Sequence, residues 1–199
     1  MSLNQGGGHM YDQLQQFELG MSRYEVQLKV HSSLWSEAFS VLQEKLNEAC
    51  AFKIQFHHIG STSVSGIRAK PILDVLGVGA SVEILDDEKS AVESLGFTWK
   101  GEYGIPGRRY SVLYDPSENR SFVHLHMFVE GNPEVEKHIL FREYLRAHPS
   151  AAQTYDGKKA ELSERFKSQR DKYTEGKSEL IQNLLNRAKV WKREGQDLL

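Results

Sequence analysis

The chain has 199 residues, of which 39% are hydrophobic and 26% charged, and a formal net charge of -2. This length suits one well-packed domain better than two, so we expect one domain that contains one site. The balanced charge gives no basic excess for non-specific nucleic-acid binding, and nucleic acid is not an expected partner, although local clusters can still bind small anions.

The sequence also indicates where the protein works. No run approaches the roughly 18 consecutive apolar residues of a membrane-spanning helix, and the N-terminus lacks the apolar region of a signal peptide. The single cysteine, Cys50, lies in an apolar helical pattern with no activating base beside it. These features predict a reduced, cytoplasmic protein with no membrane partner.

The first ten residues, MSLNQGGGHM, combine a glycine run with a His-Met pair and show no periodicity, which is typical of a disordered leader or an added segment. Beyond them, hydrophobic periodicity, capping residues and turn residues predict the elements. In chain order we expect a helix over 34–50, a strand over 52–59, a loop over 60–70, a strand over 71–78, a helix over 82–95, strands over 97–100, 109–114 and 121–130, and helices over 133–147, 150–170 and 174–193.

This order of elements predicts an α+β (mixed α/β) fold, in which a small mixed sheet is flanked by helices and followed by a C-terminal helical segment over 133–193. The last helix carries an apolar stripe that is most simply a core face; an exposed part of it would alternatively serve as a homodimer surface. The stripe consists of Leu180, Leu184, Leu185, Ala188 and Trp191.

The strand over 71–78 is apolar on both faces except at Asp74. Strands of this kind lie in the centre of a sheet, and an unpaired carboxylate buried there would cost several kcal/mol. Asp74 therefore needs a partner, which is a metal cation, an arginine or lysine, or a set of backbone N–H groups.

The loop before this strand is rich in small hydroxylated residues. Gly60 allows the backbone to approach a ligand closely, and Ser61, Thr62 and Ser63 offer hydroxyl and amide groups that suit phosphate oxygens. Lys70 adds positive charge. The alternative is structural: the loop only caps a helix, and Asp74 forms a salt bridge with Arg68 or Lys70.

The stretch HIGSTSVSGIRAKPILDVLGV at 58–78 resembles the signature of the GrpB family, whose usual form is close to HIGST-S/A-VPG-L-xxKP-I-ID-I-L. HLHMF at 124–128, FREYLRAHP at 141–149 and the pattern Y..GK..LI from Tyr173 resemble the later motifs of the same family. The resemblance covers about residues 24–190, which it indicates to be a single domain.

The GrpB resemblance implies a nucleotidyltransferase-like fold of the DNA polymerase β type, in which a Gly-Ser pair precedes Asp-x-Asp or Asp-x-Glu on a strand. Carried over, Gly60 and Ser61 match the pair that holds nucleotide phosphates, and Asp74 matches the first metal-binding carboxylate. Two acids spaced in this way lie on one face of a strand and clamp Mg²⁺. The second acid is replaced by Leu76, so the paired clamp is incomplete.

The strand over 121–130 offers substitutes for the missing acid. Its alternation places His124 and His126 opposite an apolar face, together with Phe122, Phe128 and Glu130. We expect Asp74, His124 and His126 as metal ligands, with Asp74 and His126 as the catalytic residues; the ion would be Mg²⁺ or Mn²⁺, or Zn²⁺ because imidazole suits transition metals. A hydrogen-bonded structural pair of histidines is the alternative.

Basic residues elsewhere supply further candidates. Arg109, next to Arg108 at the start of a strand, is expected to bind phosphate, with a solvated turn as the alternative. Lys177 in the later EGK motif is an additional phosphate candidate. The lysines and arginines between 158 and 172 interleave with acids, which indicates an exposed helical face.

Three functions remain open at this stage. The first is a metal-dependent nucleotidyltransferase that moves a nucleoside monophosphate from a nucleoside triphosphate to an unknown acceptor. The second is a nucleotide- or metabolite-binding module without transfer activity, linked to nucleotide or coenzyme A metabolism because relatives of the family are fused to dephospho-coenzyme A kinase. The third is a metalloenzyme built on the aspartate and the two histidines.

Overall fold

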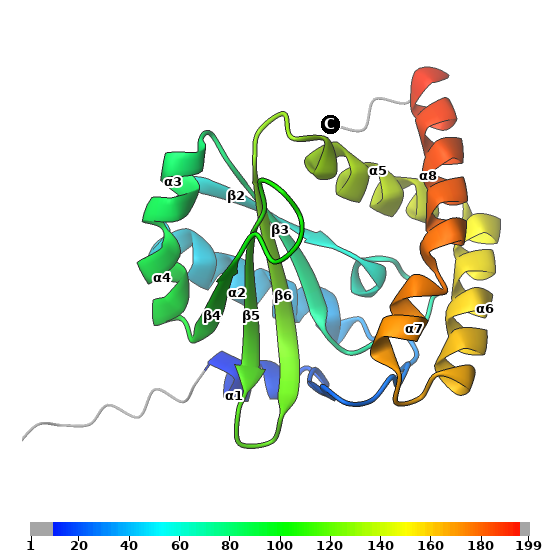
Figure 1. The fold of residues 1–199 in the computed structure, drawn as a ribbon, viewed down its shortest axis with the longest axis horizontal. Helices are drawn as coiled ribbons and strands as arrows, with labels where there is room; N and C mark the ends of the chain where they lie inside the picture. The colour runs from blue at the N-terminus through cyan, green and yellow to red at the C-terminus, as the bar shows by residue number, and fades with distance from the viewer. Residues whose placement is uncertain (1–9, 196–199) are drawn as a thin grey trace, which may run out of the picture.

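The centre of the fold is a mixed β-sheet (Figure 1). In the computed structural model, which describes residues 10–195, the strands pair in the order β2-β3-β6-β5-β4, and the short β1 also pairs with β6. Pairing of β3 with β6 is parallel, and the other named pairs are antiparallel. The strands are β1 (Met21–Ser22), β2 (Ile54–Ile59), β3 (Leu73–Gly79), β4 (Phe97–Gly101), β5 (Arg109–Asp115) and β6 (Arg120–Val129).

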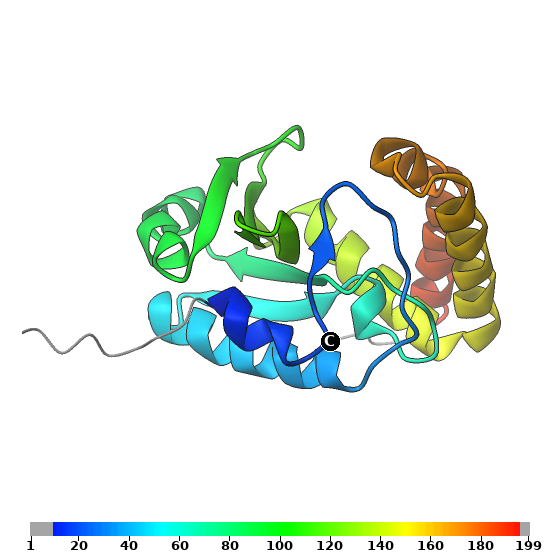
Figure 2. The ribbon, with the colours of Figure 1, turned by 90° about the horizontal axis from the view of Figure 1, so that it is seen from below.

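Helices cover one face of the sheet and form a second body beside it, which we call the helical lobe (α5 to α8; Figures 1 and 2). Buried residues of α1 to α4 share one core cluster with the sheet, and α5, α6 and α8 form a second cluster together with Val64 and Ile67 of the loop between β2 and β3. The helices are α1 (Met10–Gln15), α2 (Leu34–Ala49), the 3-10 helix η1 (Ser61–Ser63), α3 (Val82–Asp87), α4 (Lys89–Ser94), α5 (Pro133–Ala147), α6 (Pro149–Arg165), α7 (Arg170–Glu175) and α8 (Ser178–Arg193).

The expected α+β fold, with a small mixed sheet, flanking helices and a C-terminal helical segment, is confirmed by this arrangement. Within residues 10–195, no helix combines the length and the apolarity that crossing a membrane requires. The apolar stripe of α8 faces the lobe interior with Leu184 and Ala188, whereas Leu180 and Trp191 are partly buried against it.

Three helices expected from periodicity are shorter than predicted: the helix over 150–170 ends at Arg165, and two others are divided. The helix over 82–95 is divided at Glu88, a buried residue whose carboxylate accepts a 2.7 Å hydrogen bond from Lys53. The helix over 174–193 is divided into α7 and α8 near Gly176, where a Cβ atom would lie 2.7 Å from Leu162 Cδ2. In both places the division coincides with a tertiary contact.

The hydrophobic core includes residues that precede the segment with the family resemblance. Met10 and Leu14 of α1 belong to the main core cluster, and Met21 of β1 is also buried. Met10, which was assigned to the leader, therefore belongs to the fold, and the rest of that expected leader lies outside the described residues.

Strand β3 is buried on both sides, as its apolar sequence predicts. Leu73 and Val75 pack into the main core on the α2 side, and Leu76 packs with Phe128 and Ile139 beneath α5. On this second face Asp74 and Val78 are only partly buried.

One residue of β6 faces differently from the prediction. Phe122 belongs to the main core instead of the histidine face, because the pairing of β5 with β6 shifts by one residue between Leu113 and Tyr114. A bulge of this kind changes the side to which the following side chains point.

Candidate functional site

The Gly-Ser-Thr turn is shaped by Asp74. Gly60 follows β2 with φ 70°, and a Cβ atom at this position would collide with the Asp74 carboxylate. Since glycine alone combines this backbone conformation with the missing Cβ, Gly60 lets the turn lie directly against the acid. The turn is supported from behind by a 2.9 Å hydrogen bond between Thr62 Oγ1 and His58 Nε2.

Asp74 forms a hydrogen-bonded pair with His124. The two residues lie side by side in the parallel β3–β6 register, and His124 Nδ1 donates to Asp74 Oδ1 at 3.2 Å. Burial alone would raise the pKa of Asp74, but the hydrogen bond and the charge of His124 outweigh burial and lower it. The carboxylate is therefore ionised, and its side chain remains 35% exposed.

His126 lies next to this pair but has a different partner. Its Nδ1 accepts a hydrogen bond from Arg108 Nη1 at 3.3 Å, and burial lowers the pKa of His126 to about 3. The ring is consequently neutral, with its proton on Nε2. A neutral histidine whose free nitrogen already accepts from a guanidinium is a poor general base and a poor metal ligand.

A cavity of about 310 Å³, the inner cavity, opens in front of the Gly-Ser-Thr turn. The sheet side contributes Asp74, His124 and His126, and the helical lobe contributes Tyr155, Tyr173, Thr174 and several basic residues. The basic residues that line it are Lys70, Lys159, Arg170 and Lys177. Four basic side chains thus surround one acid.

Lys70 and Lys177 lack an acidic partner of their own. Both ammonium groups lie over the ring of Tyr173, at 5.5 and 4.4 Å from its centroid, and within the described chain no carboxylate forms a salt bridge with either. Burial lowers the pKa of Lys70 and lowers that of Lys177 to about 8. Their positive charge is therefore available to a ligand.

Lys159 is used structurally. Its Nζ donates to the backbone oxygen of Arg68, and Asp156 accepts from the Arg68 backbone N–H, Nε and Nη2 at 2.6, 3.0 and 2.7 Å. We call these three residues the Asp156 network; it attaches the loop after the Gly-Ser-Thr turn to α6. Arg68 is thus the partner of Asp156, and the predicted alternative of an Asp74–Arg68 salt bridge is wrong.

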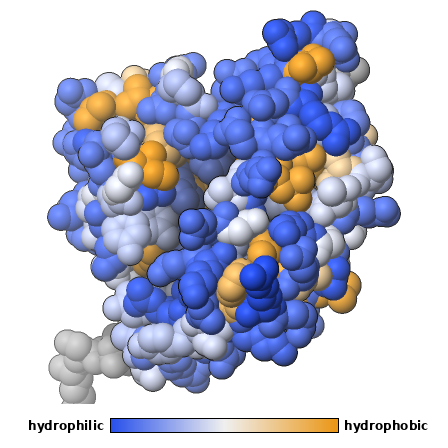
Figure 3. Space-filling model, turned by 45° about the vertical axis from the view of Figure 1, so that its right-hand side comes forward, coloured by the Kyte–Doolittle hydropathy of each residue, from blue (hydrophilic) through white to orange (hydrophobic). Residues whose placement is uncertain are grey.

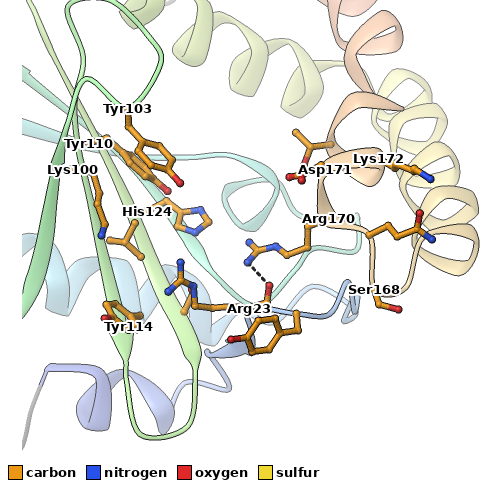
Figure 4. A pocket seen from close by; sticks show the side chains of 15 residues that line it. Arg23, Lys100, Tyr103, Tyr110, Tyr114, His124, Ser168, Arg170, Asp171 and Lys172 are labelled. Carbon is orange, nitrogen blue, oxygen red and sulfur yellow. Dashed lines mark hydrogen bonds between the residues drawn. The ribbon is translucent and has the colours of Figure 1, made fainter.

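A larger space of about 920 Å³, the outer cleft, continues from the inner cavity between the sheet and the helical lobe (Figure 4). The space-filling view shows the hollow between the two bodies, with mainly hydrophilic surface around it (Figure 3). His124, Arg170 and Thr174 line both spaces. Arg170 is held in place by a 2.9 Å hydrogen bond from Nη1 to the backbone oxygen of Arg23.

Most residues that the sequence predicted for the site lie together in the inner cavity. They are Gly60, Ser61, Thr62, Lys70, Asp74, His124, His126 and the additional candidate Lys177.

Two predicted phosphate-binding residues do not line this cavity. The Ser63 hydroxyl donates to the Gly60 carbonyl at 2.7 Å and closes the turn. Arg109 lies on the opposite face of β5 from Tyr110 and pairs with Asp86, Nη2 to Oδ2 at 2.8 Å, because neighbouring residues of a strand alternate in direction. Arg108 instead extends toward the histidines.

The sequence prediction missed the contribution of the helical lobe. Lys159 and Arg170 were assigned to an exposed helical face, yet Lys159 is 1% exposed and both line the cavity. The local charge pattern held no signal for this, because it is the packing of the lobe against the sheet that brings these side chains inward.

The residues do not fit the expected His/Asp metal centre. In the part of the chain that the structure describes, no group of three or more His, Cys, Asp or Glu side chains is placed to hold a metal ion. The Nδ1 atoms of His124 and His126 are engaged with Asp74 and Arg108, respectively. Asp74 by itself can offer one carboxylate to an ion that arrives with its own phosphate ligands.

Comparison with known proteins gives consistent likenesses. The family model described as GrpB protein matches residues 25–187. UPF0157 protein YqkA of Bacillus subtilis is 38% identical over 170 residues, which are 85% of this chain and 49% of that protein, so the chain spans about half its length.

Among solved structures, the conserved protein GrpB from Enterococcus faecalis superposes with a TM-score of 0.76 and 31% identity, over 83% of this chain and 99% of that one. A poly(U) polymerase bound to MgGTP is matched with a TM-score of 0.45 and 10% identity, over 71% and 43% of the two chains.

Proposed function

The chain belongs to the GrpB family, and from this premise we propose that it binds a nucleotide through its phosphate groups in the inner cavity. The supporting observation is the excess of positive charge there. Lys70, Arg170 and Lys177 face the Gly-Ser-Thr turn, and Asp74 is the one acid among the lining residues.

The chemistry of these groups suits a polyphosphate. Ammonium and guanidinium groups form charge-assisted hydrogen bonds with phosphate oxygens, and these bonds are roughly twice as strong as neutral ones. The two lysines without a carboxylate partner gain the most from such a ligand, because it supplies the negative charge that the folded chain lacks at this place.

Transfer of a nucleoside monophosphate from a nucleoside triphosphate is the second candidate function, and the ionised Asp74 carboxylate favours it. Mg²⁺ commonly binds proteins through one or two carboxylates together with the phosphates of the substrate. An ion that enters with a nucleoside triphosphate could contact Asp74, whose side chain reaches the cavity. Because His126 is neutral and bound to Arg108, it does not serve as the general base that transfer requires, so binding is the better supported function.

Calorimetric titration tests the binding proposal. ATP and inorganic tripolyphosphate, each with and without Mg²⁺, are titrated into the full chain and into Lys70→Met/Lys177→Met. We expect both ligands to bind the parent and the double variant to bind each at least tenfold more weakly, because two charge-assisted contacts are lost. Lys45→Met is the matched control, since Lys45 pairs with Glu48 on the surface and should leave the affinity unchanged.

Two results would overturn the proposal: no binding of either ligand to the parent, or equal affinities of the parent and the double variant. The same titrations with Asp74→Asn address the second candidate. If Asp74 contacts Mg²⁺, this variant loses the increase in affinity that Mg²⁺ gives the parent. If the variant keeps that increase, Asp74 has no role in metal binding.

A further inference from the structure

We infer that the outer cleft binds the nucleobase of the nucleotide whose phosphates occupy the inner cavity, and that the base stacks on the exposed ring of Tyr103. This inference rests on the proposed phosphate site. The two spaces meet at His124, Arg170 and Thr174, so a molecule whose phosphates fill the inner cavity leads directly into the outer cleft. Ligand pockets typically measure about 300 to 1,000 Å³. The inner cavity alone is at the lower limit of that range and suits the phosphate part of a nucleotide.

Aromatic side chains distinguish the outer cleft from the inner cavity. Tyr103, Tyr110 and Tyr114 line its sheet side, and Tyr24 lies in the N-terminal segment that borders it. Tyr103 stacks on Tyr110, with 5.3 Å between the ring centroids and an interplanar angle of 22°. Tyr110 thus covers one side of the Tyr103 ring, while Tyr103 remains 65% exposed toward solvent and the cleft (Figure 4).

The backbone presents Tyr103 in a conformation that is rare for a bulky residue. Its φ is 44°, in the left-handed region that costs a residue with a large side chain roughly 1 to 3 kcal/mol. Strain of this kind persists only where the surroundings enforce it.

Arg108 provides that enforcement as a positioning residue. It is 6% exposed, and its guanidinium donates from Nε to the Glu102 backbone oxygen at 3.1 Å and from Nη2 to the Tyr103 backbone oxygen at 2.6 Å. Glu102 in turn accepts from the Gly107 N–H at 2.6 Å. The turn between β4 and β5 is therefore fixed before a ligand arrives, which reduces the entropy cost of binding.

The experiment compares a ligand that has a base with one that lacks it. ATP and inorganic tripolyphosphate, both with Mg²⁺, are titrated into the parent, Tyr103→Leu and Tyr103→Phe. We expect Tyr103→Leu to bind ATP about tenfold more weakly, equivalent to about 1.4 kcal/mol, and tripolyphosphate as the parent does. Tyr103→Phe keeps the ring and should retain the parent affinity for ATP.

Phe52→Leu is the matched control. Phe52 is also an exposed aromatic residue with positive φ, 75% exposed at 59°, but it lines neither space, and its replacement should not change ATP binding. The inference is overturned if Tyr103→Leu binds ATP as tightly as the parent does, or if it loses affinity for tripolyphosphate to the same extent. Failure of both ligands to bind the parent would instead refute the phosphate site itself, so the two proposals fail in different ways.

Discussion

Asp156 and Asp74 are both carboxylates that lie among half-buried basic groups, yet the chain uses them in opposite ways. Asp156 accepts three hydrogen bonds from Arg68 and lies 3.9 Å from Lys159, so its charge is neutralised within the fold. Asp74 has His124 as its hydrogen-bond partner and opens onto a cavity with two unpaired lysines. Charges that are matched inside the fold stabilise it, whereas charges left unmatched at a cavity are available to a ligand.

The largest effect expected from this comparison is on stability. Asp156→Asn should lower the free energy of unfolding by about 3 kcal/mol. It removes the negative charge that lies against the Arg68 guanidinium and the buried Lys159 ammonium. Urea denaturation measures the change. Glu161→Gln is the control: Glu161 pairs with Lys158 at an exposed position, where a salt bridge contributes about 0.5 kcal/mol. Equal losses in the two variants would contradict a special role for the Asp156 network.

The sequence predicted the sheet side of the site better than the helical side. Alternation along β6 placed the two histidines on one face, the family resemblance set them beside Asp74, and the apolar surroundings of Asp74 required that it have a partner. The partner itself was left open, because parallel pairing of β3 with β6 sets Asp74 opposite His124 and this register has no local signature.

Arg170 and Lys159 illustrate what could not be predicted. Each lies in a segment of alternating charges that reads as a solvated helix, and only the packing of the helical lobe decides which of those charges turn inward. The sequence was equally unable to tell which of two adjacent arginines, Arg108 or Arg109, points to the site. Either Arg108 or Arg109 had to face the histidines, and the register of β5 selects Arg108.

A second prediction concerns pH and the support behind the Gly-Ser-Thr turn. Burial lowers the pKa of His58 to about 4, against 6.5 for the unfolded chain, and its ring stacks on Phe39. The unfolded state therefore binds more protons between these values, and stability falls as the pH decreases. For this histidine alone we expect a loss of about 2 kcal/mol between pH 7 and pH 5.

Urea denaturation of the parent and of His58→Gln at the two pH values isolates this contribution. The glutamine variant, which has no titrating group at this position, should lose about 2 kcal/mol less than the parent between pH 7 and pH 5. His126, whose pKa burial lowers to about 3, adds to the slope in both proteins with the same sign. An identical pH dependence in parent and variant would show that His58 is protonated equally well in the folded and unfolded chains.

The smallest expected change in stability compares a matched and an unmatched charge most directly, since it concerns two lysines of the same cavity. Lys159 donates to the Arg68 backbone oxygen, whereas Lys177 has only the Tyr173 ring beneath it. Methionine keeps the apolar stem of either side chain but removes the ammonium. Lys159→Met should therefore destabilise the fold by about 2 kcal/mol, and Lys177→Met should stabilise it by about 1 kcal/mol, because it removes a half-buried charge that the fold does not match.

The pH dependence of the Lys177→Met effect gives the decisive check. Burial lowers the pKa of Lys177 from 10.5 to about 8, so the folded chain binds fewer protons than the unfolded chain between these values. The cost of the charge is fully present below pH 8 and disappears as the pH rises toward 10.5, and the stability gained by Lys177→Met should shrink accordingly between pH 7 and pH 10. If Lys177→Met instead destabilises the protein as Lys159→Met does, Lys177 is part of the structural framework, and the inner cavity loses one of its two unmatched charges.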